Sequence, residues 1–374
     1  MINFNLFDLL VSNMKKRIGI LNSGGDCAGL NTVIDAVVKA LSKDDEYEII
    51  GFYRGYEGLL EGNYVQLDKA YTTQYRWIGG TILKSTNKGN FPCKKDNEEF
   101  DSQELEVIEK AYKNYTDLGL DGLVILGGDG TLYTAYRLQK FGFNIIGVPK
   151  SIDNDLNATT FTFGFHTAVQ LANNAIDALH TTANSHDRIM ILEVMGRDAG
   201  WIALYSGIAG GANIILIPEM PFSYNKIKEF LDYRYNTLNK SSIIVVSEAA
   251  KNVDEGASFN NWDPLTKGQI RYGGIGQKLA DYINQNTNYE ARSTSLGHIQ
   301  RGGSPIAFDK VISTQLGAYA ARMVRSGNWG TMIAYNDNGI SEVSLDKGVL
   351  ELKLVEPNSQ LVNLAKEIGI SFGD

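Results

Sequence analysis

VILGGDGTLYTAY, residues 124–136, passes from an apolar run through Gly127, Gly128 and Asp129 into a sequence of helical period. ILNSGGDCAGLN, residues 20–31, has the same order of apolar run, Gly-Gly-Asp and helix. An apolar strand that leads directly into a helix is the building unit of parallel α/β layers. Glycines at the carboxyl end of such a strand let a phosphate approach backbone N–H groups beside the next helix N-terminus. The two units therefore predict an α/β fold with a phosphate-binding edge, although a single Gly-Gly-Asp also fits a tight turn with a helix cap.

The rest of the chain alternates short apolar runs with longer stretches of helical period. Apolar stripes predict core helices at 31–41 and 102–118, the second capped by Ser102 and ended by Gly119. Near-continuous apolar runs indicate strands covered on both faces. We expect strands at 17–21, 48–52, 122–126, 144–148, 188–193, 213–217 and 242–246. The polar segments 84–102 and 252–273 are predicted to be long loops.

Composition narrows the classes of partner and compartment. The 374 residues suffice for two domains, and the formal net charge of −8 argues against a nucleic-acid or anionic-membrane partner. Two cysteines, Cys27 and Cys93, provide neither a disulfide framework nor a metal-ligand spacing, so a cytoplasmic location is expected. No uncharged apolar run reaches the length of about 18 residues that a membrane span requires. Residues 1–16 carry Asp8 within their apolar part and are interpreted as an N-terminal extension, not a secretion signal.

Charged residues cluster next to glycines and strand ends. PKSIDND, residues 149–155, supplies aspartates that can accept a proton from a hydroxyl attacking a phosphoryl group, although such a cluster alone is more commonly a solvated acidic turn. Arginines and a histidine lie near Met195-Gly196 and Gly302-Gly303 and are suited to clamp a sugar phosphate. Neither a G-x-x-x-x-G-K-[ST] motif nor a complete G-x-G-x-x-G after a strand is present. That absence disfavours P-loop NTPases and Rossmann dehydrogenases.

Six motifs in this order and at these separations resemble the phosphofructokinase family: SGGDCAGLN, GGDGT, PKSIDND, EVMGR, SEAA and GHIQRGGSP. The resemblance runs from about Arg17 to the C-terminus. It implies two similar Rossmann-like three-layer domains with mostly parallel sheets, and an active site in the cleft between them. After the extension 1–16, the donor-nucleotide domain would comprise 17–164 plus about 300–353, and the sugar-phosphate domain 165–299 plus about 354–374.

The activity implied by this resemblance is that of a 6-phosphofructokinase of glycolysis. Such an enzyme transfers the γ-phosphoryl group of ATP, with Mg²⁺, to the 1-hydroxyl of fructose 6-phosphate and gives fructose 1,6-bisphosphate. The resemblance also implies a cytoplasmic homodimer or homotetramer with shared active sites. NAD and lipid kinases share the GGDGT loop but lack PKSIDND and GHIQRGG. A non-catalytic regulatory subunit would lack Asp153 or Arg197, and both are present.

Residue by residue, the resemblance implies that Asp153 is the general base and that Arg197 stabilises the charge on the transferring group. Ser151 stands where the family usually has threonine and would contact that group, and Asp155 would support the metal or the turn. Asp129 would bind Mg²⁺. The donor-site residues would be Gly25, Tyr56, Asn87, Lys88, Asp129, Gly130 and Thr131. The substrate-site residues would be Ser151, Asp153, Met195, Gly196, Arg197, Glu248, His298 and Arg301, together with Arg188 and Arg292 from a neighbouring subunit.

Three positions depart from the family pattern. Asn87 replaces an arginine of the bacterial allosteric members, and Lys88 is expected to supply the charge. Asp35 stands at an arginine position of the nucleotide effector site, where it would repel phosphate. Lys150 replaces a small glycine and is typical of the pyrophosphate-dependent branch, in which it would stabilise the transferring group and count as catalytic. That branch also carries aspartate at the position of Gly130, so glycine here predicts ATP as donor and leaves pyrophosphate as the alternative.

Overall fold

The computed structural model describes residues 15–43, 45–86, 91, 99–238, 240–253, 255–257, 259–262 and 270–374. The chain forms two compact units. The first consists of the chain up to Lys150 with 156–163 and 307–351, and the second of 151–155, 164–306 and 352–374. Residues 151–155 and 300–306 thus pack with the second unit, whereas the sequence prediction placed 151–155 in the first domain and began that domain's returning segment at about residue 300.

The first unit is built on an eight-stranded sheet in the order β16-β15-β5-β4-β1-β2-β3, with β6 paired to β5. Pairings among β1, β2, β4, β5 and β15 are parallel, whereas β3 and β16 pair antiparallel at the two edges. The strands are β1 (Lys16–Asn22), β2 (Tyr47–Phe52), β3 (Tyr64–Gln66), β4 (Leu120–Gly127), β5 (Ile145–Ser151), β6 (Phe163–Gly164), β15 (Thr331–Asn336) and β16 (Gly339–Ser344). Side chains of β1, β4 and β5 are almost entirely buried, as the apolar runs predicted.

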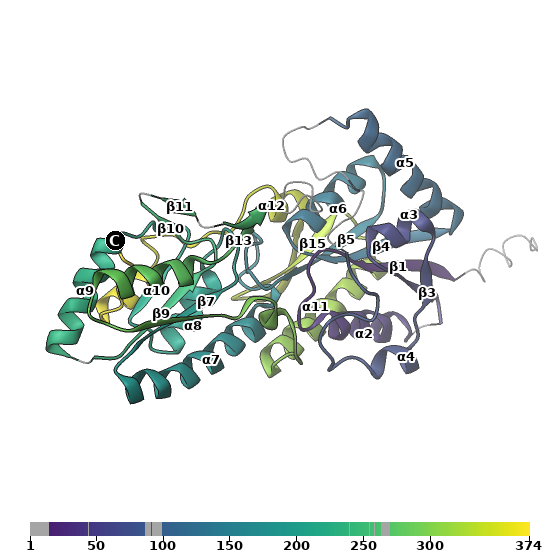
Figure 1. Ribbon diagram of the computed structural model, residues 1–374. Helices are drawn as coiled ribbons and strands as arrows, with labels where there is room; N and C mark the ends of the chain where they lie inside the picture. Colours follow the sequence, from purple (N-terminus) through teal and green to yellow (C-terminus); the bar gives the residue numbers. More distant parts are fainter. Residues whose placement is uncertain are drawn as a thin grey trace, which may run out of the picture. The chain divides into compact units, whose positions relative to one another are not determined.

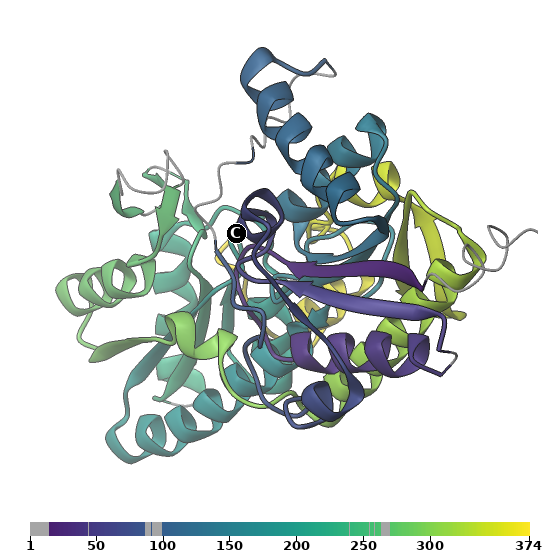
Figure 2. The same cartoon turned by 90° about the vertical axis from the view of Figure 1, so that its right-hand side faces the viewer.

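Helices cover both faces of this sheet (Figures 1 and 2). α2 and α11 pack against each other on one face, with α4 against α2, whereas α3, α5, α6 and α12 lie on the other face. The bounds are α2 (Leu30–Leu41), α3 (Tyr56–Glu61), α4 (Lys69–Thr73), α5 (Ser102–Asp117), α6 (Asp129–Phe141), α11 (Ala307–Ser326) and α12 (Leu345–Val349). Gly317 allows the close packing of the long pair, because a Cβ there would lie 2.6 Å from the carbonyl oxygen of Val33.

The second unit has a four-stranded sheet in the order β14-β7-β9-β8, and every pairing in it is parallel. α7 and α8 pack on one face and α9 and α10 on the other (Figure 1). The bounds are β7 (Ile189–Val194), β8 (Ile214–Leu216), β9 (Ser242–Ser247), β14 (Ala291–Ser295), α7 (Phe165–His186), α8 (Trp201–Ala209), α9 (Tyr224–Thr237), α10 (Ile275–Asn286), the 3₁₀ helix η2 (Gly297–Arg301) and α13 (Gln360–Glu367). The predicted α/β architecture with mostly parallel sheets is confirmed in each unit.

Local predictions hold except at a few places. All seven predicted strands and both helices are present with small shifts at their ends. The cap of α5 is Asp101, not Ser102, because the Asp101 carboxylate accepts a hydrogen bond from Glu104 N–H. The predicted loop 252–273 contains short strand pairs, β10 (Lys251–Asn252) with β11 (Gly256–Ala257) and β12 (Phe259–Trp262) with β13 (Ile270–Tyr272). Within the described residues, no helix combines the length and apolar character of a membrane span.

Candidate active site

The two glycine loops of the first unit emerge from neighbouring strands. β1 pairs with β4 in parallel, and Asn22 lies opposite Leu126 at the carboxyl end of the pair. The backbone N–H of Ser23 then donates to the carbonyl of Leu126 across the two strand ends, at 3.3 Å. Open α/β sheets bind their ligands at this edge. The two Gly-Gly-Asp loops therefore lie side by side at the same edge of the sheet.

The second loop places a helix N-terminus at that edge. Gly128 caps α6, so Asp129, Gly130 and Thr131 form its first turn, where backbone N–H groups have no partner within the helix. Gly127 is required by packing, because a Cβ there would lie 2.3 Å from the Thr131 side chain. Such N–H groups, together with the helix dipole, favour a bound phosphate.

Tyr56 supports the same turn from the side of the core. Its side chain is buried, and its hydroxyl donates to the carbonyl of Thr131 at 2.7 Å. Tyr56 therefore fixes the position of the loop backbone. Asn87 and Lys88, also predicted for the donor site, lie outside the described residues.

The first loop borders a cavity of about 340 Å³ at the same edge of the sheet. Gly24 adopts a φ of +80°, a left-handed conformation that suits glycine, and its N–H donates to the carbonyl of Thr86 at 3.2 Å. The Ser85 hydroxyl donates to the carbonyl of Gly24. The cavity is lined by Gly24, Gly25, Asp26, Thr81, Lys84, Ser85 and Thr86. Its walls are mainly small and polar, which suits a phosphate-bearing ligand better than an apolar one.

Lys150 ends the part of β5 that belongs to the first unit. Its side chain is buried, and its ammonium group donates to the carbonyl of Gly25. A Cβ on Gly24 would lie only 3.7 Å from the ammonium nitrogen. The lysine that departs from the family pattern thus brings a positive charge to the first glycine loop.

One predicted metal ligand, Asp129, lies at the start of α6, directly beside these glycines. Among the described residues, no group of three or more His, Cys, Asp or Glu side chains is arranged to hold a metal ion by itself. Phosphate-bound Mg²⁺ needs only one or two carboxylates, because phosphate and water supply its other oxygens. The donor set therefore fits Mg²⁺ that arrives with a phosphate ligand.

In the second unit, Ser151–Asp155 forms a tight hydrogen-bonded turn. The Ser151 hydroxyl donates to a carboxylate oxygen of Asp155 at 2.7 Å and accepts from Asp153 N–H at 3.1 Å. Asn154 has a φ of +54°, a conformation that asparagine tolerates better than most residues. Asp153 itself is buried. Ser151 is therefore part of the scaffold that fixes the predicted base.

The carboxyl ends of β7 and β9 bring four predicted substrate residues together. The loop after β7 contains Met195, Gly196 and Arg197, and Glu248 follows β9 directly. The N–H of Arg197 donates to a carboxylate oxygen of Glu248 at 3.3 Å, and the Arg197 side chain is exposed. Because Gly196 has a φ of +149° and a Cβ there would lie 2.6 Å from the Ala199 carbonyl, the loop requires glycine.

Glu248 has a strongly perturbed ionisation. Burial, reinforced by the negative charge of Asp153, raises the pKa of Glu248 to about 7. The Glu193 carboxylate adds to this shift, whereas the N–H of Arg197 opposes it. Glu248 therefore has a pKa near neutrality, and it lies close enough to Asp153 for the two charges to interact. Perturbed carboxylates of this kind cluster at functional sites.

η2 carries His298 and Arg301 and follows β14, the neighbour of β7 in the sheet. Between them, Gln300 is buried, and its side-chain oxygen accepts a hydrogen bond from Met195 N–H at 2.7 Å. This contact joins η2 to the loop after β7. Sequence reasoning missed Gln300 as a support, although its place inside GHIQRGG was a usable signal.

Arg188 and Arg292 lie at the opposite end of β7 from Arg197. Arg188 directly precedes β7, and Arg292 is the second residue of β14. Both side chains pair with Glu290, Arg188 at 2.8 Å and Arg292 at 2.6 Å, and these pairs lower the pKa of Glu290. Arg188 and Arg292 therefore lie apart from the other residues that were predicted for the sugar-phosphate site.

Asp35, which was predicted to prevent phosphate binding at a nucleotide effector site, is a buried residue of α2. Its carboxylate forms an ion pair with Lys39 at 2.9 Å and accepts hydrogen bonds from the hydroxyls of Thr72 and Thr73 at 3.0 and 3.2 Å. Arg76 lies 3.6 Å from it. The side chain thus holds α4 against α2.

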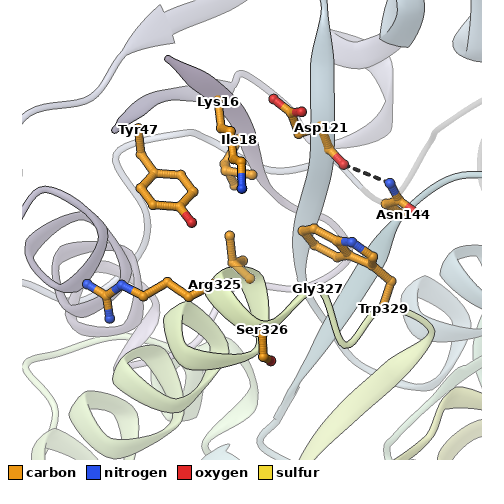
Figure 3. A pocket seen from close by; sticks show the side chains of 10 residues that line it. Lys16, Ile18, Tyr47, Asp121, Asn144, Arg325, Ser326, Gly327 and Trp329 are labelled. Atoms are coloured by element: carbon orange, nitrogen blue, oxygen red, sulfur yellow. Dashed lines mark hydrogen bonds between the residues drawn. The ribbon is translucent and has the colours of Figure 1, made fainter. Parts of the chain in front are cut away.

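A cavity of about 350 Å³ lies at the other edge of the first sheet, where β1 and β4 begin (Figure 3). In this view the Tyr47 and Trp329 rings flank the space, with Lys16 at its upper rim. Only glycine fits at position 122, because a Cβ there would lie 2.4 Å from the Trp329 ring. None of the predicted site residues lines this cavity. The glycine loops lie at the carboxyl edge, so this cavity is separate from them.

Comparisons with known proteins agree with these motifs. A family model described as Phosphofructokinase matches residues 17–324. ATP-dependent 6-phosphofructokinase 2 of Clostridium perfringens is 46% identical over 361 residues, which is 96% of this chain and 99% of that protein. Pyrophosphate–fructose 6-phosphate 1-phosphotransferase of Amycolatopsis methanolica is 43% identical over 343 residues, 91% of this chain and 96% of that protein.

Among solved structures, phosphofructokinase from Saccharomyces cerevisiae is similar, with a TM-score of 0.73 at 27% identity over 89% of this chain. This chain spans only 44% of the length of that yeast chain, but nearly the full length of the two bacterial relatives.

Proposed function

This chain belongs to the phosphofructokinase family, and on that premise we propose that it is an ATP-dependent 6-phosphofructokinase. The substrates are fructose 6-phosphate and ATP, and the products are fructose 1,6-bisphosphate and ADP. The observation that carries the proposal is the set of residues around Asp153. A buried carboxylate on a fixed turn, next to the perturbed Glu248, has the properties of a general base beside a sugar-binding carboxylate.

In the reaction, the 1-hydroxyl oxygen of the sugar forms a bond to the γ-phosphorus of ATP. The bond between that phosphorus and the β–γ bridging oxygen breaks, and ADP leaves with the electron pair. Asp153 accepts the proton of the sugar hydroxyl as the new bond forms. Arg197, exposed on the loop after β7, offsets the negative charge that develops on the transferring group.

The other residues bind and orient the two substrates. Glu248 accepts hydrogen bonds from sugar hydroxyls, while Met195, Gly196, His298 and Arg301 hold the sugar phosphate. Backbone N–H groups of the two glycine loops and the N-terminus of α6 hold the donor phosphates. Mg²⁺ bound through Asp129 supplies charge neutralisation and orientation of those phosphates when it is present.

ATP is favoured as donor by Gly130 in the first turn of α6. Without a side chain, this position leaves space for the nucleotide α-phosphate and places no negative charge there. Lys150 favours the alternative donor, pyrophosphate, and a relative at 43% identity is named for that activity. Lys150, however, contacts the carbonyl of Gly25, a position from which its charge can reach a terminal phosphate of either donor.

The donor assignment is tested by measuring kcat/KM of the purified protein with ATP and with pyrophosphate at equal Mg²⁺ concentration, fructose 6-phosphate being the acceptor in both. We expect ATP to be preferred. A clear preference for pyrophosphate would show that Lys150, not Gly130, selects the donor. Absence of sugar bisphosphate with both donors would contradict the proposed function itself.

We further propose a cytoplasmic homodimer or homotetramer in which Arg188 and Arg292 complete the sugar-phosphate site of a neighbouring subunit. Arg188 and Arg292 lie near the start of β7 and Arg197 lies beyond its end, and this separation supports the assignment. Sedimentation at assay concentration tests it, because a fully active monomer is incompatible with a shared site.

A further inference from the structure

Lys353 contacts the turn that holds Asp153, although it belongs to no motif of the sequence. It lies in the returning segment of the second unit, far along the chain from that turn. Its ammonium nitrogen donates to the side-chain oxygen of Asn154 at 3.0 Å. Its backbone N–H donates to the carbonyl of Asp155 at 2.9 Å. One residue therefore binds two successive residues directly after the predicted base.

The segment around Lys353 is itself fixed to the start of α8. The indole N–H of Trp201 donates to the carbonyl of Lys353 at 2.8 Å. Glu219 accepts hydrogen bonds from Val355 N–H and from Gly200 N–H, both at 2.9 Å. The Lys353 ammonium also lies 5.8 Å from the centre of the Trp201 ring, within the range of a cation–π interaction. Lys353 thus connects the turn to the start of α8.

The turn has a conformation that benefits from such a support. Asn154 is left-handed, with a φ of +54°, which is less favourable than an ordinary backbone conformation. Ser151 closes the turn through its bonds to Asp153 and Asp155, but neither of these bonds involves the Asn154 side chain. The hydrogen bond from Lys353 therefore holds the strained residue from a second side.

The surroundings of Lys353 oppose its charged form. Burial lowers the pKa of Lys353 to about 7, and the charge of Asp155 offsets part of that shift. Enclosing a lysine in this way opposes its charged form and is a cost to the fold. A methionine of similar length would fill the same space without that cost.

We propose that Lys353 is a positioning residue for phosphoryl transfer: by holding Asn154 and Asp155, it fixes the Asp153 carboxylate in the orientation that accepts the sugar proton. This inference rests on the proposed function and adds a residue to it. Small displacements of a catalytic group cost about 10- to 100-fold in rate. Lys353 touches neither substrate in this scheme, so its loss is expected to change kcat more than KM.

The test compares Lys353→Met with wild type at pH 6.5, below the pKa of about 7 at which Lys353 loses its charge, with Lys278→Met as matched control. Lys278 is an exposed lysine on α10, in the same unit. We expect Lys353→Met to lower kcat by about 10-fold or more, with less than about 3-fold change in KM for fructose 6-phosphate. Lys278→Met is expected to leave both constants unchanged. Equal loss in the two variants, or a loss confined to KM, would overturn the proposal.

A double-mutant cycle with Asn154→Gly separates positioning from general destabilisation. Glycine accepts the left-handed φ but lacks the side-chain oxygen that Lys353 binds. If Lys353 acts through Asn154, adding Lys353→Met to Asn154→Gly costs much less than it costs in wild type. Independent, multiplicative losses would contradict the proposal.

Hydrogen–deuterium exchange of the peptide covering 151–156 provides a readout that does not depend on turnover. Faster exchange in Lys353→Met than in Lys278→Met is expected, and unchanged exchange would overturn the positioning role. Wild-type turnover separately tests the proposed function. If wild type has no kinase activity while Lys353→Met still exchanges faster than Lys278→Met, the proposed function is rejected and the contact of Lys353 with the turn is supported.

Discussion

The predicted ligand-binding edges of the two units differ in the groups that they present. In the first unit the edge consists mainly of backbone: two glycine loops, the N-terminus of α6 and a cavity with small polar walls. In the second unit the corresponding edge carries buried or half-buried charged side chains, Asp153, Glu248 and Glu193 among them. Lys150, predicted to be catalytic, adds a buried cation to the first glycine loop of that unit.

This difference has a physical consequence for mutation. A site made of backbone is damaged by adding atoms, because a new side chain occupies the space of the ligand. A site made of buried charges is damaged by removing one charge, because the remaining buried groups lose the interaction that compensated their burial. The following predictions use that contrast, in order of decreasing expected effect.

Removing the proposed base should have the largest effect. Asp153→Asn keeps the shape of the side chain but cannot accept the sugar proton, so kcat should fall by about 10²- to 10⁴-fold. Binding of fructose 6-phosphate, measured by calorimetry, should stay within a few-fold of wild type. Asp281→Asn, an exposed change on α10, serves as control. Turnover near the wild-type value in Asp153→Asn would remove Asp153 from the mechanism.

Adding a carboxylate to the backbone site should have the next largest effect. Gly130→Asp places a negative charge in the first turn of α6, so kcat/KM for ATP should fall by about 100-fold through crowding and repulsion of phosphate. KM for fructose 6-phosphate should change little. The same preparation assayed with pyrophosphate is the internal control, because that donor has no α-phosphate. Equal kcat/KM for ATP in wild type and Gly130→Asp would show that Gly130 does not select the donor.

Loss of a sugar-phosphate arginine should be smaller and should depend on the assembly. Arg188→Ala removes one charge-assisted contact, for which about a 10- to 100-fold rise in KM for fructose 6-phosphate is expected. If the arginine serves a neighbouring subunit, mixed oligomers of Arg188→Ala and Asp153→Asn should regain activity, since some sites then contain both intact groups. Mixtures no more active than the sum of their parents would contradict a shared site.

The contrast also explains how much the sequence alone could predict. Glycine loops can be recognised because a close approach leaves a Gly-Gly signature directly after an apolar strand, and both loops occur where they were predicted. Strands buried on both faces were recognised for a similar reason. The cap of α5 was misplaced by one residue because Asp101 and Ser102 are both good caps, and only the backbone conformation separates them.

Contacts between distant segments could not be predicted in this way. Lys353 has no sequence signal, because its partner Asn154 lies 199 residues away along the chain. Glu248 was assigned from a resemblance, but its pKa depends on burial and on Asp153, which only the folded chain brings near. Asp35 was interpreted as a loss of effector binding, which stays a prediction, and its contacts with Lys39, Thr72 and Thr73 add a structural role that the sequence did not indicate. Functional roles of the individual site residues stay predictions.

The smallest expected effect concerns stability, and it tests whether the charged edge of the second unit is costly to the fold. Burial raises the pKa of Glu248 from 4.5 to about 7, so the folded protein holds this proton more tightly than the unfolded chain does. Stability therefore falls as pH rises through that window, and the cost is complete above pH 7. Glu248→Gln removes the charge, so its advantage in free energy of unfolding should grow from pH 4.5 to pH 7 and then level off.

The size of that advantage should be about 1 kcal/mol, because partial exposure of Glu248 reduces the full value that the shift would give. Urea unfolding of wild type and variant at several pH values measures it, with Glu229→Gln as control because Glu229 is exposed on α9. The same variant should bind fructose 6-phosphate more weakly, since it loses a charged acceptor for sugar hydroxyls. A pH-independent difference in stability would show that folding does not raise the pKa of Glu248. Asp153 would then be the remaining support for a second-unit edge built on buried charge.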